Sequence, residues 1–371
     1  TSRVCFDRRY WAWKLTDFPE ATLQRNAAPL CWYLQQPEVK DEGAILAWVK
    51  AALLFTTRIQ HRDGSFDQAY PFERSYGATA FLLPDLISAY TAVQDLFTEH
   101  EKERVENCLI MAADLLCKRA EQHEFISNHL AGAALGLLKA NQLFNKTKYL
   151  EKSSQIIAAV LSAQSEEGWF PEYGGADPGY QTLCMYYLAQ IYRLQPTKTL
   201  HAAIERSLAF QGYFAHPDGS FGGEYGSRRT EIYYLGGIAL LADDFPAAAA
   251  LTTAMLHSIE NGHTTTGMDG DIGHTAPLLS NTNMAIDAPP ALKDYDPLPM
   301  DSPSGSHYFE SAGIGSISHP IYYAIYGSSN GGVLKVFRKS DQRVLLDDCG
   351  LLGITQRGNM ITSQVRDPRA E

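Results

Sequence analysis

The chain lacks an excess of positive charge, a long hydrophobic run and any clustered cysteines. Its 371 residues carry a net charge of −11, which argues against nucleic acid or anionic membrane as a partner, because both bind cationic surfaces. The longest apolar stretches, such as Leu130 to Leu138, are shorter than the roughly 18–20 residues of a membrane-spanning helix, so none is expected. The six cysteines are scattered without a Cys-x-x-Cys pair, which indicates buried thiols rather than zinc ligands.

Three segments share one short signature, an acidic-Gly turn. They are Gln60-His-Arg-Asp-Gly-Ser-Phe66, Gln164-Ser-Glu-Glu-Gly-Trp-Phe170 and His216-Pro-Asp-Gly-Ser-Phe221, with a weaker copy at Met268-Asp-Gly-Asp271. The turn glycines lie at positions 64, 168, 219 and 270, at intervals of 104, 51 and 51 residues. These intervals indicate repeated supersecondary units, one of which, near residue 116, is degenerate.

Helical patterns flank each turn. The segments after the turns are apolar around their whole circumference, which is typical of helices buried on all sides. The preceding helices are predicted at Ala44 to Ile59, Glu101 to Lys118, Leu150 to Ala163, Leu200 to Gln211 and Ala247 to Ile259, and the following ones begin near Ser75, Ser127, Gly179, Thr230 and Gly273. An inner ring of helices inside an outer ring satisfies both patterns. The sequence therefore predicts a mainly α fold, an (α/α)5–6 toroid of helical hairpins.

A short β-rich segment follows a proline-rich linker from Ala288 to Pro303. Strands are predicted at Tyr322 to Tyr326, Val333 to Arg338 and Arg343 to Leu346, which are separated by Gly-Gly and Ser-Asp turn signals. We expect a small antiparallel sheet here. The predicted domains are the toroid, residues 1–290, and a short or truncated β-sandwich-like segment, residues 304–371.

The repeat predicts which residues begin the inner helices. Twelve residues after each turn glycine come Tyr76, Tyr180, Glu231 and Thr282, and the degenerate unit contributes Asn128. In a ring these positions would face one central cavity, where helix N-termini favour anions. Residues at or near these positions that can bind a substrate or move a proton are Glu73, Arg74, Tyr76, Asn128, His129, Glu172, Tyr173, Tyr180, Gln181, Arg228, Arg229, Glu231 and His274.

The residue types in this cavity favour one kind of chemistry. Tyrosine, histidine, asparagine and arginine suit removal of a proton next to a carboxylate better than they suit hydrolysis by two carboxylates. His274 after Asp269-Gly-Asp271 is a weak ligand set, so neither a metal nor another cofactor is predicted. Arg228 and Arg229 are chosen as binding residues because they lie in the next repeat and can hold an anionic sugar.

Two stretches stand out, Ser127-Asn128-His129 and Gly168-Trp-Phe-Pro-Glu-Tyr-Gly-Gly-Ala-Asp-Pro-Gly-Tyr180-Gln181. They resemble the heparinase II/III and alginate lyase superfamily of α/α-toroid polysaccharide lyases. The stretch from Gly331 to Gly350 is similar to the start of that family's β-domain. The β segment departs from the family, because it contains His307 and His319 but no His-x-His cluster.

The resemblance implies a uronate lyase. It implies that Asn128 neutralises the uronate carboxylate, that His129 acts as base or carboxylate partner, and that Tyr180 acts as acid or acid/base. Glu172 would orient Tyr180 or a sugar hydroxyl. The implied partner is an anionic polysaccharide or oligosaccharide, and a degradative lyase would be periplasmic or secreted, although a cytoplasmic location and any oligomeric state stay open.

Three other functions fit the same sequence. A uronate C5-epimerase shares the first proton abstraction. An α/α-toroid glycoside hydrolase would use paired carboxylates, for which Asp177, Glu172 and Glu231 are the candidates. A non-catalytic glycan-binding protein of polysaccharide biosynthesis or export would keep the ring without the reaction.

Overall fold

The computed structural model describes residues 5–6, 18–121, 124–262, 272–329 and 331–363, and residues 272–274 without their side chains. The chain divides into two compact units. The first comprises Thr1–His123, His129–Val160 and Thr266–Ile286, and the second comprises Glu124–Asn128, Leu161–Thr265 and Asp287–Glu371. The predicted division into residues 1–290 and 304–371 stays a prediction.

Helices build the first unit. They are η2 (Ala21–Asn26), α1 (Ala27–Tyr33), α2 (Glu42–Ile59), α3 (Tyr76–Val93), η3 (Gln94–Leu96), α4 (Glu99–Lys118), most of α5 (Ser127–Phe144) and of α6 (Thr147–Ser162), and α11 (Ile272–Ile286). Helix α3 is buried on nearly every side, whereas α4 is amphipathic and begins with a capping box formed by Thr98 and Glu101. No helix in the described ranges is both long and apolar enough to cross a bilayer.

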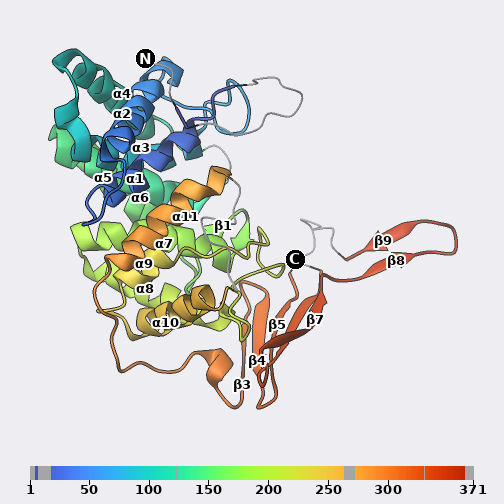
Figure 1. Cartoon of the computed structure of the whole chain (residues 1–371). Coiled ribbons are helices and arrows are strands. Elements are labelled where there is room, and N and C mark those ends of the chain that lie inside the picture. The colour runs from blue at the N-terminus through green and yellow to red at the C-terminus, as the bar shows by residue number, and fades with distance from the viewer. Residues whose placement is uncertain (1–4, 7–17, 122–123, 263–271, 330, 364–371) are drawn as a thin grey trace. The chain divides into compact units, whose positions relative to one another are not determined.

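The second unit combines helices and strands (Figure 1). Its helices are α7 (Pro178–Leu194), α8 (Lys198–Gln211), η4 (Gly212–Phe214), α9 (Leu235–Leu240), α10 (Pro246–Glu260) and η5 (Pro299–Asp301). Its strands are β1 (Pro171–Glu172), β2 (Gly175–Ala176), β3 (Gly305–Phe309), β4 (Ile314–Ser318), β5 (Tyr322–Gly327), β6 (Val333–Arg338), β7 (Arg343–Asp348), β8 (Leu352–Ile354) and β9 (Met360–Thr362).

The acidic-Gly signature links consecutive helical hairpins through the hydrogen bonds of its glutamine. Gln60 Nε2 donates to the Gly64 carbonyl at 3.1 Å and to the Cys108 carbonyl of α4 at 2.8 Å. In the second unit Gln164 repeats both bonds, to Gly168 at 3.0 Å and to Ala203 of α8 at 2.8 Å. The glycines of these two turns have a positive φ, +94° at Gly64 and +98° at Gly168, which explains why glycine occurs there.

Most predicted helix boundaries are confirmed, and two positions need correction. Thr282 lies inside α11 rather than at its start, and α9 begins at Leu235 rather than near Thr230. The delay has a packing cause: a Cβ on Gly179 would lie 2.6 Å from the Thr230 carbonyl oxygen, so residue 230 is pressed against the start of α7. Glu231 therefore lies in an extended loop and not at a helix start.

Five antiparallel strands form one sheet in the order β3-β4-β5-β6-β7. The three predicted strands correspond to β5, β6 and β7 and are confirmed. Strands β3 and β4 were not predicted from the sequence, because they are rich in glycine and serine, which are poor strand formers.

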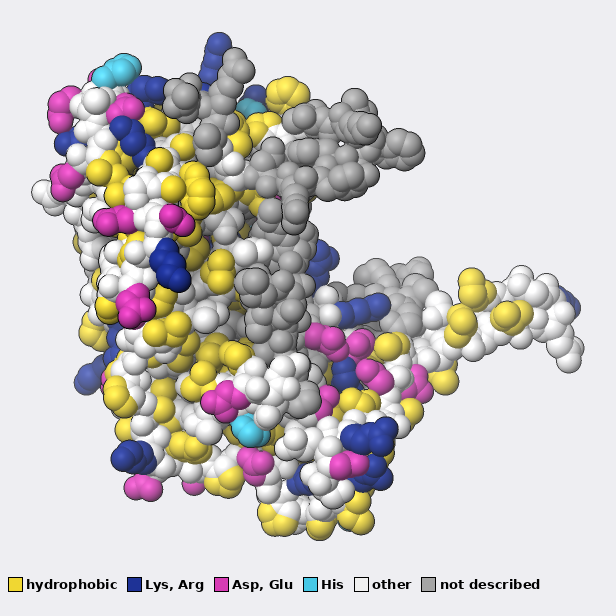
Figure 2. All heavy atoms as spheres, viewed as in Figure 1, with side chains coloured by type: hydrophobic (Ala, Val, Ile, Leu, Met, Phe, Trp, Pro, Cys, Tyr) yellow, Lys and Arg dark blue, Asp and Glu magenta, His cyan; other side chains and the backbone are white. Residues whose placement is uncertain are grey.

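The β8–β9 hairpin exposes apolar side chains and extends from the sheet (Figure 1). Figure 2 shows hydrophobic side chains along this hairpin. The most exposed are Leu351, Leu352, Ile354, Met360 and Ile361. A two-stranded hairpin is only marginally stable in water by itself, so this part of the second unit gains little from core packing.

His216 connects the turn that follows η4 to the sheet within the second unit. Its Nε2 lies 2.7 Å from the Tyr225 hydroxyl and its Nδ1 lies 2.8 Å from Ser220 Oγ, while its ring stacks on Phe337 of β6 at 4.6 Å. Burial, aided by the charge of Lys335, lowers the pKa of His216 well below its ordinary 6.5. The ring is therefore held neutral in the folded protein.

A His216→Phe variant is expected to lose less unfolding free energy than wild type when the pH falls below 6.5. Because the folded-state pKa of His216 is depressed, its contribution to stability is present above pH 6.5 and is lost as the pH falls below that value. As the pH falls below that value, the unfolding free energy of wild type should decrease relative to that of the variant by at most about 1.4 kcal/mol per pH unit. Urea titrations between pH 5 and 8 measure it, with exposed His257→Phe as control; parallel curves for wild type and His216→Phe would refute the expectation.

Candidate active site

Asn128 and Glu172 form a buried pair at the start of α5. The Asn128 backbone amide donates to Glu172 Oε1 at 2.9 Å and its Nδ2 donates to Oε2 at 2.6 Å. Both residues are fully buried, and Asn128 Oδ1 is buried without a hydrogen-bond partner. Ser127 reinforces the pairing by donating to the Pro171 carbonyl at 2.7 Å. Glu172 thus orients the Asn128 amide, and its predicted role toward Tyr180 or a sugar hydroxyl stays a prediction.

The pKa of the Glu172 carboxyl is shifted in favour of its neutral form. Burial raises the pKa of Glu172 well above its ordinary 4.5, and the charge of Asp177 adds to this, whereas the two donors of Asn128 oppose it. A carboxyl of this kind resists ionisation until the pH is well above its usual range. The Asn128–Glu172 pair is therefore a polar group that carries little negative charge next to the site.

Tyr180 lies in the first turn of α7, where Asp177 fixes the backbone. Asp177 Oδ1 accepts from the Tyr180 amide at 2.9 Å, and Oδ2 accepts from the Arg228 amide at 2.7 Å. Pro178 occupies the first helical position, which its restricted φ favours. One carboxylate therefore joins the turn that carries Tyr180 to the loop that carries Arg228.

Tyr173, Tyr180 and Arg228 form a cluster, which we call the tyrosine–arginine cluster. Tyr173 lies in the β1–β2 turn at φ +53°, and its ring meets that of Tyr180 edge to face at 5.1 Å. The Arg228 guanidinium lies over the Tyr173 ring at 4.8 Å. Burial, with contributions from Tyr180 and Glu172, raises the pKa of Tyr173 above its ordinary value. Arg228 and the following Arg229 are exposed, so the cluster presents cationic groups beside two half-buried phenols.

The side chains of other predicted site residues bond to partners outside this cluster. Gln181 is buried and its amide bonds to the Phe170 amide, the Gly168 carbonyl and Ser207, which is a structural arrangement. Glu231 Oε1 accepts from Lys335 Nζ at 2.8 Å.

Three predicted residues belong to the first unit. Arg74 lies 3.8 Å from the Asp63 carboxylate, Tyr76 is buried at the start of α3, and His129 Nδ1 lies 2.7 Å from Glu121 Oε2. The side chain of His274 lies outside the described residues.

Lys335 is a functional candidate that sequence reasoning missed. Its ammonium is almost fully buried and lies 2.8 Å from Glu231, 3.2 Å from Glu224 and 3.4 Å from Asp347. Burial opposes its charge, yet these carboxylates raise the pKa of Lys335 above its ordinary value. A signal was available: the two-residue period of β6 places Lys335 on the same buried face as Val333 and Phe337.

One described group of side chains has the chemistry of a metal site. Ligand atoms of Glu224, Asp347 and Cys349 lie within 4.8 Å of one another. The Lys335 ammonium already neutralises two of these carboxylates, which leaves little reason for a divalent ion to bind.

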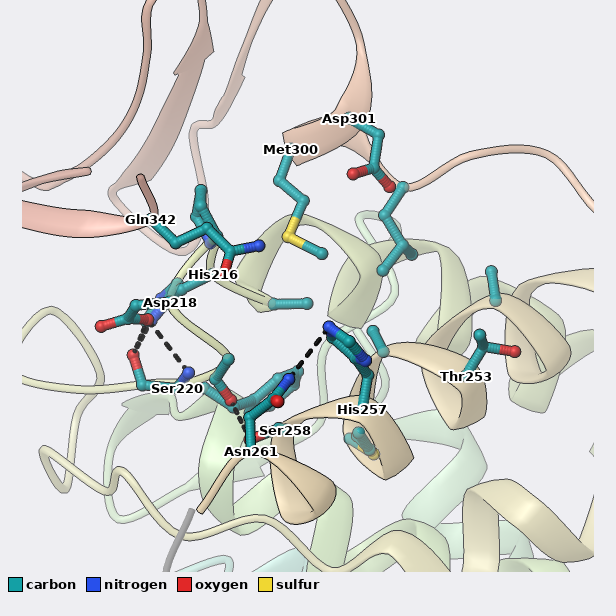
Figure 3. Close-up of a pocket in the computed structure, with 18 of the residues that line it drawn as sticks. His216, Asp218, Ser220, Thr253, His257, Ser258, Asn261, Met300, Asp301 and Gln342 are labelled. Carbon is teal, nitrogen blue, oxygen red and sulfur yellow. Dashed lines mark hydrogen bonds between the residues drawn. The ribbon is translucent and has the colours of Figure 1, made fainter. Parts of the chain in front are cut away.

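A separate pocket of about 250 Å³ lies between the His216–Phe221 turn, α10 and the loop before β3. Figure 3 shows Asp218, His257, Asn261, Met300 and Gln342 around it. Its polar groups pair with one another, as in the Asp218–Ser220 bond at 2.6 Å and the Asn261–His257 contact at 3.0 Å. None of the predicted site residues lines this pocket.

Residues 44–240 match the family described as the ulvan lyase N-terminal domain. The chain belongs to this family. No curated protein matches the sequence. The predicted membership of the heparinase II/III-like group is supported only at the coarser level of an α-toroid polysaccharide lyase family.

The solved structure of a lyase agrees with this fold. Chondroitin AC lyase of Streptomyces coelicolor A3, in complex with chondroitin sulphate, is similar over 85% of this chain and 49% of its own, with a TM-score of 0.59 and 14% identity. The ulvan lyase family chain therefore spans about half the length of that enzyme. The prediction of an α/α-toroid followed by a short antiparallel β segment is confirmed.

Two hydrolases are less similar. A family 88 glycosyl hydrolase from Bacteroides vulgatus is similar over 73% of this chain and 92% of its own, with a TM-score of 0.47 and 11% identity. A family 127 β-L-arabinofuranosidase from Geobacillus stearothermophilus T6 is similar over 88% of this chain and 65% of its own, also with a TM-score of 0.47 and 11% identity.

Proposed function

We propose that the protein is a polysaccharide lyase that cleaves a uronic-acid-containing glycan by β-elimination. The tyrosine–arginine cluster carries this proposal, because it sets an exposed guanidinium over the Tyr173 phenol, whose ring packs against that of Tyr180. A guanidinium suits a sugar carboxylate or sulfate, and a phenol suits proton transfer at a sugar oxygen. Membership of the ulvan lyase N-terminal domain family supports the same reaction class.

Each proposed residue has one step. The Asn128 amide, oriented by Glu172, would donate to the uronate carboxylate and so acidify the hydrogen on C5. His129 would remove that proton, and its electron pair would form the C4–C5 double bond. The C4–oxygen bond then breaks, and Tyr180 would give its proton to the leaving oxygen. Arg228, with Arg229 next to it, would hold the anionic sugar.

The three candidate carboxylates Asp177, Glu172 and Glu231 argue against two-carboxylate hydrolysis. Asp177 is occupied by two backbone amides, Glu172 by the backbone N–H and one side-chain N–H of Asn128, and Glu231 by Lys335. A glycosidase needs one free carboxylate as nucleophile or base and one carboxylic acid facing the same bond. These bonds leave each of the three candidates committed to a protein partner, which favours the lyase.

A Tyr180→Phe variant is expected to lose activity without losing its fold. Removal of the phenolic proton donor should reduce kcat by about 10²–10⁴-fold, because no general acid then protonates the leaving oxygen. The assay follows the ultraviolet absorbance of the unsaturated uronate product with ulvan, chondroitin sulphate and other uronate polysaccharides. Tyr192→Phe is the matched control, since Tyr192 lies in the same helix and contacts His201 instead.

Each outcome of this assay assigns one function. New reducing ends without the absorbance would indicate a hydrolase. Inversion at C5 without chain cleavage, seen by NMR, would indicate an epimerase. Binding of the polysaccharides without turnover would indicate a glycan-binding protein, and full activity of the Tyr180→Phe variant would remove Tyr180 from the mechanism.

A further inference from the structure

The loop between α2 and α3 exposes two aromatic rings of the first unit. Tyr70 is 56% exposed and Phe72 is 78% exposed, and Pro71 between them is exposed as well. Aromatic rings usually bury most of their surface, and apolar side chains that gather on a surface mark interaction sites. We call these three residues the aromatic tip.

Asp67 fixes the part of the loop that carries Phe72. Its Oδ2 accepts from the Phe72 amide at 2.8 Å, and its Oδ1 accepts from the Arg74 amide at 2.9 Å. His61 Nε2 lies 2.8 Å from the same Oδ1, and the His61 ring lies 6.2 Å from the Phe72 ring. One carboxylate therefore binds two backbone amides of the loop and a side chain at its start.

Glu73 and the two ends of the loop complete the restraint. Glu73 Oε2 accepts from the amides of Gln68 and Ala69, each at 2.8 Å. At the base of the loop the Ser75 amide donates to the Phe66 carbonyl at 2.8 Å. The loop is thus ordered when the chain folds, so a ligand that binds to it pays little entropy for ordering it.

Two residues of the loop have backbone angles that side chains disfavour. The φ angle is +64° at Phe72 and +52° at Arg74. A bulky residue in the left-handed region is an outlier, whereas glycine adopts this region without strain. The loop therefore keeps the Phe72 ring in water in spite of its conformational cost. Strain of this kind is concentrated at functional sites.

Arginine side chains accompany the rings in this loop. Arg62 and Arg74 are both exposed. Arg74 lies 3.8 Å from Asp63, which pairs more closely with Arg119 at 2.7 Å. The other two carboxylates of the loop accept from its own backbone amides. The loop therefore presents guanidinium groups together with apolar rings, and guanidinium groups bind carboxylates and other planar or multidentate anions.

We propose that the aromatic tip, with Arg62 and Arg74, is a binding site of the first unit for an anionic polysaccharide. The C–H face of a pyranose ring is apolar and packs on an aromatic ring, while the guanidinium groups pair with carboxylates or sulfates of the glycan. Membership of the ulvan lyase N-terminal domain family agrees with this ligand class. The site does not depend on the proposed reaction, because a chain without lyase activity can still bind a glycan.

Affinity electrophoresis of the full chain, in gels that contain ulvan, chondroitin sulphate or a neutral glucan, tests the rings. Wild type should be retarded by at least one of the two anionic polysaccharides. Phe72→Ala should weaken that binding by about 3–10-fold, because an apolar contact of one ring is lost, and Phe72→Trp should keep it. Trp48→Ala is the matched control, since Trp48 is a 48% exposed ring of α2 in the same unit. Equal binding by wild type and Phe72→Ala would overturn the proposal.

The charge of the ligand is tested in the same gels. An Arg62→Gln and Arg74→Gln double variant should bind the anionic polysaccharide more weakly, and added salt should weaken the binding of wild type, because salt screens exposed charges. Retardation of wild type by the neutral glucan to the same extent would refute an anionic ligand.

Sedimentation distinguishes the glycan from a second copy of the chain. A wild-type dimer that becomes a monomer in Phe72→Ala, without a change in polysaccharide binding, would assign the aromatic tip to self-association and overturn the proposal. Binding that depends on Phe72 in a chain that cleaves no polysaccharide would refute the proposed function and leave this site standing.

Discussion

An Asn128→Asp variant is expected to lose at least about 100-fold in activity, because an acidic side chain cannot donate to the substrate carboxylate when ionised. The same change should destabilise the fold. Asn128 Nδ2 donates to Glu172 Oε2 at 2.6 Å. The substitution replaces this donor with a second buried carboxyl, so two carboxyl groups then face each other. Two carboxyls at this distance cannot both ionise without a large cost, and they share one proton instead.

The sign of the pH effect follows from that sharing. The pKa of Glu172 is already raised by burial, and a second carboxyl would raise it further. A group with a raised folded-state pKa contributes stability that is present below its ordinary pKa and is lost as the pH rises. The stability deficit of Asn128→Asp should therefore grow with pH from about 4.5 upward.

Thermal unfolding of Asn128→Asp at several pH values measures this deficit. Asn141→Asp is the matched control, because Asn141 is on the same helix, is partly exposed and lies well beyond the helix start. Its midpoint should follow that of wild type at every pH. A midpoint for Asn128→Asp that is independent of pH, or activity equal to wild type, would contradict the role assigned to the Asn128–Glu172 pair.

Replacement of Asp85 by alanine is expected to be the most destabilising single change in the first unit. Asp85 Oδ2 accepts from Arg25 Nε at 2.6 Å, and both side chains are less than a tenth exposed. The pair joins η2 to α3, and the Arg25 guanidinium also lies over the Phe81 ring at 5.4 Å. Breaking a buried ion pair on one side costs about 3–5 kcal/mol, since the remaining charge stays out of water.

A second cation makes this loss larger. Burial lowers the pKa of Lys139, and the charge of Asp85 opposes that shift. Without Asp85, the buried Arg25 and the half-buried Lys139 would both lose the attraction of this carboxylate. Urea unfolding of Asp85→Ala measures the effect, and Asp95→Ala, an exposed acidic residue of the same unit, should change stability by less than about 0.5 kcal/mol. A similar loss in both variants would argue against the buried pair as the cause.

Much of the fold can be predicted from the sequence because its determinants act over short distances. The turn glycines at 64 and 168 need positive φ, and the preceding glutamines reach the carbonyl of the same turn. Helix periodicity likewise depends on neighbours three and four residues away. The repeat therefore predicts the hairpins, and through the register of the hairpins it singles out Asn128 and Tyr180.

The partners of the site residues could not be predicted in this way. Glu121 lies eight residues before His129, in the degenerate unit where the turn signature is missing, and no helical spacing links the two. Lys335 reaches Glu231 across 104 residues of sequence. Strands β3 and β4 also escaped prediction, because the pairing of β3 with β4 and of β4 with β5, rather than strand propensity, holds them.

By itself the sequence determined the helical hairpins, their turns and the set of side chains able to bind an anionic sugar or move a proton, because each depends on local backbone preferences and residue chemistry. Only the tertiary structure decided which groups meet. It pairs Glu172 with Asn128 across 44 residues, hydrogen-bonds Asp177 to two backbone amides, and places Arg228 over Tyr173. The physical reason is that a buried carboxyl must be hydrogen-bonded, and its donors come from segments that lie far apart in the chain and meet only when the chain packs.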